Sequence, residues 1–178
     1  MNAKECIMGR RSIRKFKSDA VSDDVLREIV LEASYAPSWK HSQIARYYII
    51  KDEAKKAELA AHTKLWAGNG EIMKSAPAVC CVVAMKNRSG YERDGSFSTV
   101  REDRWTMFDA GVATQTFCLA AYEHGLGTVI MGLVDPDAGD VLNLPEDREL
   151  IAVVPIGYPD EEPVAPKRKA VEDLLTII

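Results

Sequence analysis

The spacing of apolar and polar positions first separates two helical segments in the N-terminal half of the chain. Apolar residues recur at helical spacing between residues 26 and 33, and Ser22 followed by two aspartates supplies the cap and the early negative charge that favour a helix start. The residues of this stripe are Leu26, Ile29, Val30 and Ala33. Residues 52–62 (DEAKKAELAAH) predict a second helix, on the surface, with its charges toward solvent.

Four apolar runs predict β-strands. The run from Ala78 to Met85 is continuously apolar, which indicates a strand buried on both faces near the middle of a sheet. Shorter runs over residues 47–50, 128–131 and 150–156 predict further strands, with a short helix over residues 136–142. Because helices alternate with single strands, the pattern indicates an α/β or α+β sandwich around one sheet.

The strongest helical pattern runs from about Thr99 to Tyr122, and Gly125 is placed to end it. Large and small apolar residues occupy several faces of this helix, so we expect protein around most of it. One small domain rarely buries a long helix on all sides, which makes a second subunit the expected partner. The residues that recur at helical spacing are Trp105, Phe108, Val112, Thr116 and Leu119. Before the helix, the polar residues 86–103 predict an exposed excursion that could cover a site.

Length and charge limit the class of protein. With 178 residues, of which 47% are hydrophobic, the chain suits a single domain, residues 1–178, with a sufficient core of its own. The net charge of −4 argues against a general nucleic-acid or membrane-surface binder. The longest apolar stretch, residues 76–85, is shorter than the roughly 20 residues of a membrane-spanning helix. The N-terminal basic residues follow the short apolar part, unlike those of a secretory signal, so a cytoplasmic location is expected.

The cysteines do not suggest a metal site. They show no CxxC spacing, and the neighbours Cys80 and Cys81 should point to opposite faces of a strand. We therefore expect all four, including Cys6 and Cys118, to be reduced apolar fillers, although Cys6 could be exposed and reactive.

The segment RRSIRKFK, residues 10–17, carries five cations and no acid. Its functional interpretation is a phosphate site, because guanidinium groups form paired hydrogen bonds to phosphate oxygens. Arg10, Ser12 and Arg14 at alternate positions of an extended segment would point to one side. The alternative is a solvated basic stretch. A second basic cluster, residues 167–169, leaves the same two interpretations open.

Motifs of several common enzymes are missing. The sequence holds neither GxGxxG after a strand nor GxxxxGK[ST], and the glycines of HGLGTVIMG follow a helix instead of preceding one. His41, His62 and His124 are scattered, and no GxSxG occurs. Hydrolytic chemistry is therefore not supported, and we predict no catalytic side chain and no metal.

Five segments in this order resemble the nitroreductase family of flavin enzymes: RRSIRKF, APSWKHSQ, the helix beginning near RWTMFDAG, HGLGTVIMG, and LIAVVPIGYP. The resemblance covers nearly the whole chain. It implies an α+β fold, a three-layer sandwich with a central mixed, mainly antiparallel sheet flanked by helices. It also implies an intertwined homodimer with two FMN sites at the subunit interface.

The resemblance assigns cofactor contacts to three parts of the chain. Arg10, Ser12 and Arg14 would contact FMN, the arginines at its phosphate and at the pyrimidine side of the ring. Pro37 and Ser38 would approach the flavin from the other subunit. The full set of expected cofactor-binding residues is Arg10, Arg11, Ser12, Arg14, Pro37, Ser38, Trp39, His41, Asn69, Ile130, Met131, Gly132 and Arg168.

The later residues of this set have more specific roles by the same resemblance. Asn69 lies where an amide often meets the pyrimidine edge. Met131 and Gly132 belong to a segment whose backbone lies against the central ring and donates toward N5. Arg168 would return to the phosphate, so both basic clusters would share one ligand.

The chain departs from the family pattern APSxxNxQPW. His41 stands at the usual Asn, Ile44 and Ala45 replace Pro-Trp, and Trp39 takes the place of a small residue. Trp39 and His41 could add a stacking wall and a titrating donor, or could be neutral changes.

The activity implied is that of an FMN-dependent NAD(P)H oxidoreductase. It would pass two electrons from reduced nicotinamide through flavin N5 to a nitroaromatic, quinone or similar acceptor. Alternatives of the same fold are a non-enzymatic flavin sensor and a reductive dehalogenase. A more distant alternative is a nucleic-acid-binding module that uses residues 10–17 as a basic arm.

Overall fold

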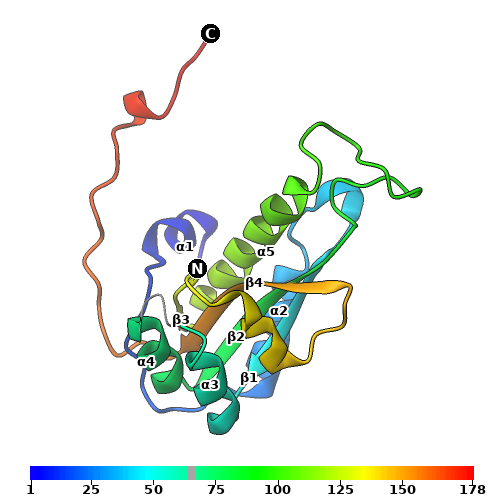
Figure 1. Cartoon of the computed structure of the whole chain (residues 1–178). Helices are drawn as coiled ribbons and strands as arrows, with labels where there is room; N and C mark the ends of the chain where they lie inside the picture. Colours follow the sequence, from blue (N-terminus) through cyan, green and yellow to red (C-terminus); the bar gives the residue numbers. More distant parts are fainter. Residues whose placement is uncertain (64–66) are drawn as a thin grey trace.

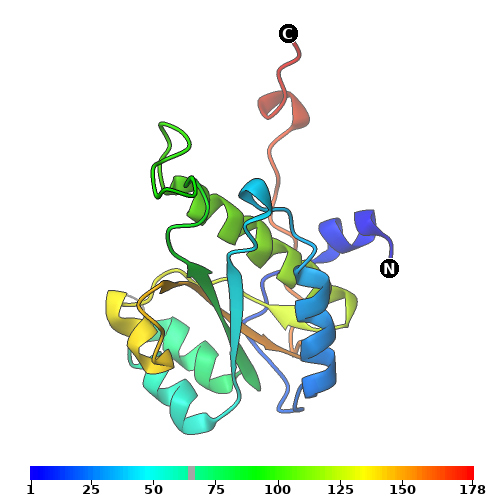
Figure 2. The ribbon, with the colours of Figure 1, turned by 90° about the vertical axis from the view of Figure 1, so that its right-hand side faces the viewer.

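The computed structural model describes residues 1–63 and 67–178 as one sheet with helices on both faces (Figures 1 and 2). The strands are β1 (Ala45–Ile50), β2 (Ala78–Met85), β3 (Gly127–Thr128) and β4 (Arg148–Gly157). The α-helices are α1 (Ala3–Gly9), α2 (Asp23–Ala33), α3 (Glu53–Ala60), α4 (Ala67–Ser75) and α5 (Arg104–Glu123). Short 3-10 helices are η1 (Trp39–His41), η2 (Pro136–Leu142) and η3 (Val171–Asp173).

The four strands lie in the order β1-β2-β4-β3, and every neighbouring pair is antiparallel. A parallel bridge joins Ser12 to Thr128 at the β3 edge. The expected mixed, mainly antiparallel sheet of an α+β fold is therefore confirmed.

The central strand β2 packs against helices on both of its faces. Ala78, Cys80 and Val82 enter the core that α2 and α5 cover, whereas Val79 and Cys81 enter the core shared with α3 and α4. Figure 2 shows the sheet between these two helical layers. The predictions of a doubly buried central strand and of opposite faces for Cys80 and Cys81 are confirmed. All four cysteines are buried and free, as expected for reduced fillers.

The two predicted N-terminal helices are present, but one charged side chain that the pattern predicted to be exposed is buried. In α2, Ser22 Oγ accepts a hydrogen bond from the Val25 amide at 3.2 Å, which confirms the predicted cap. In α3, Lys56 is only 1% exposed. Its Nζ donates to the Ala76 carbonyl at 2.6 Å and pairs with Glu53 at 2.8 Å. The prediction that all charges of this helix face solvent was wrong, because the lysine stem reaches across to the end of α4.

The long helix α5 starts at Arg104, five residues later than predicted, and stops before Gly125, whose φ is 76°. The stripe of large residues on α5, which we expected protein to cover, does not face the core of this chain. Phe108 is 62% exposed, while the face toward the sheet is built mainly from small residues such as Ala110, Ala113 and Ala121. Small side chains let the helix backbone approach the sheet, with Phe117 fully buried among them, whereas Met107 and Phe108 remain exposed. None of the helices in the described residues combines the length and hydrophobicity needed to cross a membrane.

The predicted strand over residues 128–131 is shorter than expected. Only Gly127 and Thr128 pair continuously with β4, and the ladder resumes at a single bridge between Met131 and Val153. The helix expected over residues 136–142 is the 3-10 helix η2.

Candidate functional site

The basic segment at residues 10–14 lies extended along the edge of β3. The Ile13 amide donates to the Thr128 carbonyl at 3.0 Å, and Ser12 forms the parallel bridge with the same strand. Ile13 is buried directly against Gly127, where a Cβ would lie 2.5 Å from its Cγ1. A glycine at 127 is therefore required for this close approach, which fixes the position of the basic segment.

Neighbouring side chains of the segment have different surroundings. Arg11 and Ile13 line a hollow of about 390 Å³ together with Tyr122 of α5 and the start of the C-terminal tail. The Arg11 guanidinium donates to the carbonyls of Met8 and Arg10, at 2.7 and 2.8 Å, and so caps the end of α1. Because successive residues of an extended segment alternate, Ser12 and Arg14 lie on the other side from this hollow.

The guanidinium groups of Arg10 and Arg14 are available to an anion. Arg10 Nε is buried and has no hydrogen-bond partner among the described residues. Arg14 is exposed and forms no ion pair within the described part of the chain. The acid beside the segment, Glu161, accepts the backbone amides of Arg14 and Lys15 at 2.5 and 3.1 Å instead of a guanidinium. A buried donor without an acceptor is costly, so this arrangement fits a bound phosphate.

The segment at residues 130–132 follows β3, and the backbone amides of Met131 and Gly132 differ in their hydrogen bonding. The N–H and C=O of Met131 are both bonded to Val153, at 2.8 and 3.0 Å, and its side chain is only 3% exposed. Gly132 is exposed, as is Ile130, and the Gly132 amide has no acceptor in residues 1–63 and 67–178. Of the two residues expected to line the central ring, Gly132 is therefore the one with a free N–H.

Asn69 reaches the same segment from α4. It is 5% exposed, and its Nδ2 donates to the Leu133 carbonyl at 3.3 Å, next to Gly132. Residues 10–14, the helix α4 and residues 130–132 are far apart in the sequence. The bond from Ile13 to Thr128 and the bond from Asn69 to Leu133 bring these three parts to one edge of the sheet. We call them the β3-edge group: Arg10, Ser12, Arg14, Asn69, Ile130, Met131 and Gly132.

Pro37, Ser38, Trp39 and His41 lie elsewhere in the chain, on the turn between α2 and β1. The Trp39 amide donates to Asp109 Oδ2 at 2.8 Å, near the start of α5. In contrast, Cys6 of α1 donates to the Leu119 carbonyl near the end of α5. Ten helical residues separate these two positions, or about 15 Å along the axis. Because α1 leads directly into residues 10–14, the β3-edge group lies near the end of α5. One chain therefore holds the β3-edge group and this turn at opposite ends of α5.

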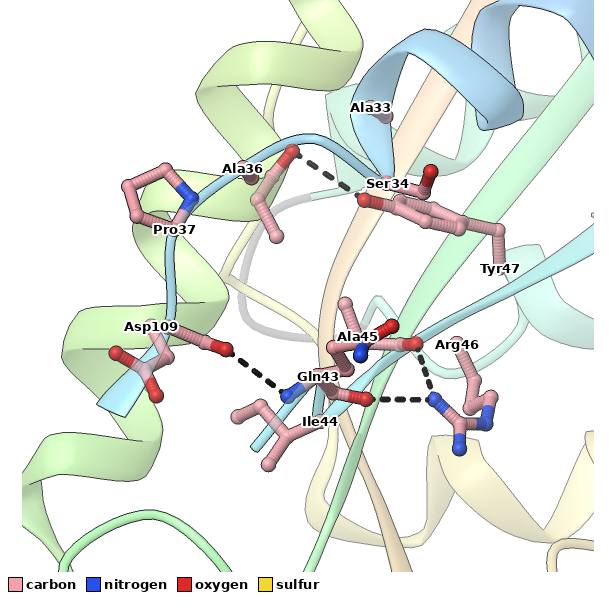
Figure 3. Close-up of a pocket in the computed structure, with 12 residues that line it drawn as sticks. Ala33, Ser34, Ala36, Pro37, Gln43, Ile44, Ala45, Arg46, Tyr47 and Asp109 are labelled. Carbon is pink, nitrogen blue, oxygen red and sulfur yellow. Dashed lines mark hydrogen bonds between the residues drawn. The ribbon is translucent and has the colours of Figure 1, made fainter. Parts of the chain in front are cut away.

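The turn borders a cavity of about 80 Å³, drawn in Figure 3. Within it the Gln43 amide donates to Ser38 Oγ at 2.9 Å, and Tyr47 Oη donates to the Ala113 carbonyl at 3.4 Å. Small-molecule sites usually enclose about 300–1,000 Å³, so this cavity is too small for a flavin. His41 is exposed outside it, and its Nε2 lies 2.8 Å from Gln43 Nε2.

Arg168 is exposed on the C-terminal tail, which runs away from the body of the domain in both views (Figures 1 and 2). The described residues of one chain do not bring it to Arg10.

His62, Asp135 and Asp137 place their ligand atoms within 4.8 Å of one another. His62 Nδ1 and Asp137 Oδ1 are 2.9 Å apart, and the Asp135 amide donates to the His62 carbonyl at 2.7 Å. These contacts join the end of α3 to η2, and the cluster lies outside the β3-edge group.

One functional candidate was not predicted from the sequence. Asp109 of α5 lies next to the turn between α2 and β1 and is only 3% exposed. Its Oδ2 accepts hydrogen bonds from Trp39, Ser42 and Ser89. Its sequence signal was visible, because it is the only acid between Arg104 and Tyr122 in an otherwise apolar and small helix.

Comparison with known proteins gives a consistent result. The sequence model described as the Nitroreductase family matches residues 7–67 and 59–158. An NADPH-flavin oxidoreductase of Vibrio harveyi is 29% identical over 173 residues, covering 91% of this chain and 68% of the relative. An NADH dehydrogenase of Thermus thermophilus is 29% identical over 182 residues, covering 91% and 89% of the two chains. A nitroreductase-type crystal structure in complex with FMN, from Desulfovibrio desulfuricans, superimposes with a TM-score of 0.80 at 28% identity and covers 100% of this chain and 98% of that one.

Proposed function

Since the chain belongs to the nitroreductase family, we propose that it is an FMN-dependent NAD(P)H oxidoreductase that reduces a nitroaromatic, quinone or similar acceptor. The observation that carries the proposal is the β3-edge group, in which the buried, unpartnered Nε of Arg10 and the open amide of Gly132 belong to one edge of the sheet. The related proteins described as NADPH-flavin and NADH enzymes support the activity. They do not favour one nicotinamide over the other.

The residues present fit FMN. Arg10 and Arg14 would meet the phosphate and the pyrimidine side of the ring, because their guanidinium groups are not neutralised by acids within the described residues. Ser12 would add a hydroxyl, and the Gly132 amide would donate to the flavin ring. Asn69 would fix the Leu133 backbone next to Gly132 with one N–H, and its second N–H and its Oδ1 would serve the pyrimidine edge of the ring. When bound, FMN supplies the two-electron chemistry, and the protein supplies position and positive charge.

We propose that the site is completed by a second copy of the chain. In one chain, Pro37 and Ser38 are held at the opposite end of α5 from the β3-edge group. Large apolar residues of α5, including Phe108 at 62% exposure, are left uncovered. An apolar groove of about 310 Å³ also runs between α1, α2 and α5. Burying these surfaces against another copy would bring the turn of one chain to the β3-edge group of the other.

The exposed tail supports the same assembly. Val171, Leu174 and Ile177 are 62%, 69% and 86% exposed, although apolar side chains favour burial. In a homodimer the tail would pack on the partner, and this would give Arg168 a path to a phosphate. Arg168 as a phosphate ligand thus depends on the dimer.

The proposed activity is tested by the visible absorption spectrum of the purified protein, before and after addition of each nicotinamide. A flavin spectrum that bleaches with NADH or NADPH is expected. The double variant Arg10→Ala, Arg14→Ala should bind FMN at least a hundredfold more weakly, because two charge-assisted contacts of about 1.5–3 kcal/mol each are lost. Arg27→Ala on α2 is the matched control. A protein that cannot be reconstituted with FMN would contradict the proposal, and bound FMN without turnover would favour a flavin sensor.

The proposed assembly is tested by sedimentation velocity. The wild-type chain should sediment as a dimer, and Phe108→Lys should shift it toward monomer while far-ultraviolet circular dichroism stays unchanged. A wild-type monomer that binds FMN normally would contradict the shared site.

A further inference from the structure

We propose that Asp109 is a positioning residue for the acceptor side of the flavin site. One oxygen of its carboxylate holds the turn at residues 38–43 and the excursion at residues 86–103 in a single arrangement. The inference rests on the proposed function, because that turn is the part expected to face the flavin of a second copy.

The geometry around Asp109 Oδ2 joins three segments. The oxygen accepts the Trp39 amide at 2.8 Å and the Ser42 hydroxyl at 3.4 Å, both from the turn. It also accepts the hydroxyl of Ser89, at the base of the excursion. The two serine oxygens are themselves 2.8 Å apart. Asp109 is 3% exposed and Ser89 is fully buried, so water does not compete for these bonds.

The turn needs such support because its backbone is strained. Lys40, His41 and Gln43 have φ values of 44°, 58° and 46°, in the left-handed region that non-glycine residues rarely adopt. A turn of this kind persists only when surrounding contacts impose it. Asp109 gives the turn two of its hydrogen bonds from outside, to Trp39 and Ser42. Ser89, itself bonded to Asp109, lies within hydrogen-bond distance of Ser42, and Arg46 of β1 donates to the Gln43 carbonyl at 2.8 Å.

A second link between turn and excursion lies at the surface. Lys40 Nζ is 2.5 Å from Glu92 Oε1, and both side chains are about half exposed. An exposed ion pair is screened by salt and contributes little. The buried cluster of Asp109, Ser42 and Ser89 is therefore what keeps the two segments in register.

The turn also carries the residues that depart from the family pattern. Trp39 packs on Trp105 with ring centroids 4.6 Å apart, and His41 projects outward on the same strained backbone. Whatever acceptor these side chains admit, their position depends on the carboxylate below them. Asp109 does not touch the β3-edge group, so it should affect acceptor binding more than FMN binding.

The test compares Asp109→Leu and Asp109→Asn with Thr114→Val. Thr114 is an equally buried polar residue of α5, and its hydroxyl donates to the Ala110 carbonyl of its own helix. The first measurement is amide hydrogen exchange of the full chain without added cofactor. In Asp109→Leu, exchange should rise at least tenfold in residues 38–43 and 86–103 together, whereas Thr114→Val should leave both unchanged. Asp109→Asn keeps an oxygen acceptor and should restore most of the protection.

The second measurement is steady-state kinetics of the FMN-loaded enzyme. Asp109→Leu should raise the acceptor KM at least fivefold and change the FMN Kd less than threefold. If Asp109→Leu does not fold, Ser89→Ala removes one link only and should raise exchange in the excursion.

Three results for Asp109→Leu would overturn the inference: exchange that rises in one segment alone, exchange equal to that of Thr114→Val, or an unchanged acceptor KM. A wild-type protein that takes up no FMN would instead overturn the proposed function, and the exchange data would still decide whether Asp109 holds both segments.

Discussion

Replacing Gly127 with alanine should displace the basic segment from β3 and weaken FMN binding. The new Cβ would lie 2.5 Å from Ile13 Cγ1, 2.7 Å from its Cβ and 3.0 Å from its Cγ2. Carbon atoms in contact prefer about 3.5–4.0 Å, so the segment must retreat by about 1 Å. The Ile13 amide, now 3.0 Å from the Thr128 carbonyl, would then lie beyond hydrogen-bond distance.

The magnitude follows from two costs. Overpacking a core contact costs about 1–3 kcal/mol, which for a domain of this size lowers Tm by about 2–12 °C. Moving Arg10 and Arg14 by about 1 Å should cost one charge-assisted hydrogen bond, about 1.5–3 kcal/mol. That loss corresponds to an FMN Kd raised by about tenfold to a hundredfold.

The assay is a titration of the apo-protein with FMN, followed by quenching of flavin fluorescence, beside a thermal melt of each variant. Gly139→Ala is the control, because its added Cβ would make only ordinary contacts, at 3.5 Å with Leu144 and 3.6 Å with Leu150. If Gly127→Ala matched Gly139→Ala in both Tm and FMN affinity, the reasoning that Gly127 sets the position of the basic segment would be refuted.

Three further predictions concern groups outside that contact. Lys56→Met should lower stability by about 1–3 kcal/mol in urea unfolding, because the buried carbonyl of Ala76 loses its donor, whereas exposed Lys55→Met should change it by less than about 0.5 kcal/mol. Equal effects of the two variants would contradict the role given to Lys56. Burial raises the pKa of all four cysteine thiols, so iodoacetamide at pH 8 should label none of them in the native protein and all of them in urea. Rapid native labelling of one thiol would show that its burial is wrong. The hydrogen bond from Lys40 lowers the pKa of Glu92 below 4.5, so this link is present above pH 4.5 and is lost as the pH falls through the lowered value. In a carboxyl NMR titration, Lys40→Met should raise that pKa, and an unchanged value would contradict the ion pair.

Local patterns were sufficient for most of the fold. The continuous apolar run at residues 78–85 identified the central strand, because a strand covered on both faces has no polar alternation. The Ser22 cap located the start of α2, and the stripe behind it identified the residues that face the core. These features depend on neighbours in sequence, so the amino-acid pattern alone contains them.

The long helix shows where such patterns mislead. The spacing of its large apolar residues correctly predicted a helix, but these residues do not face the core of their own chain. Periodicity reports that a face avoids water, without saying whether the same chain or another covers it. Likewise, Lys56 looked solvent-exposed because its burial depends on α4, which follows later in the chain.

By itself, the sequence determined the class of fold, the order of its elements and the basic segment that we propose as part of the FMN site. The tertiary structure decided which of these residues meet. It placed residues 10–14 against β3, more than 100 residues later, and left Gly132 with the open amide. It also showed that the turn at residues 38–43 lies at the other end of α5 and is held by Asp109. Spacing along a chain does not encode these distances, because they result from how the sheet and helices pack.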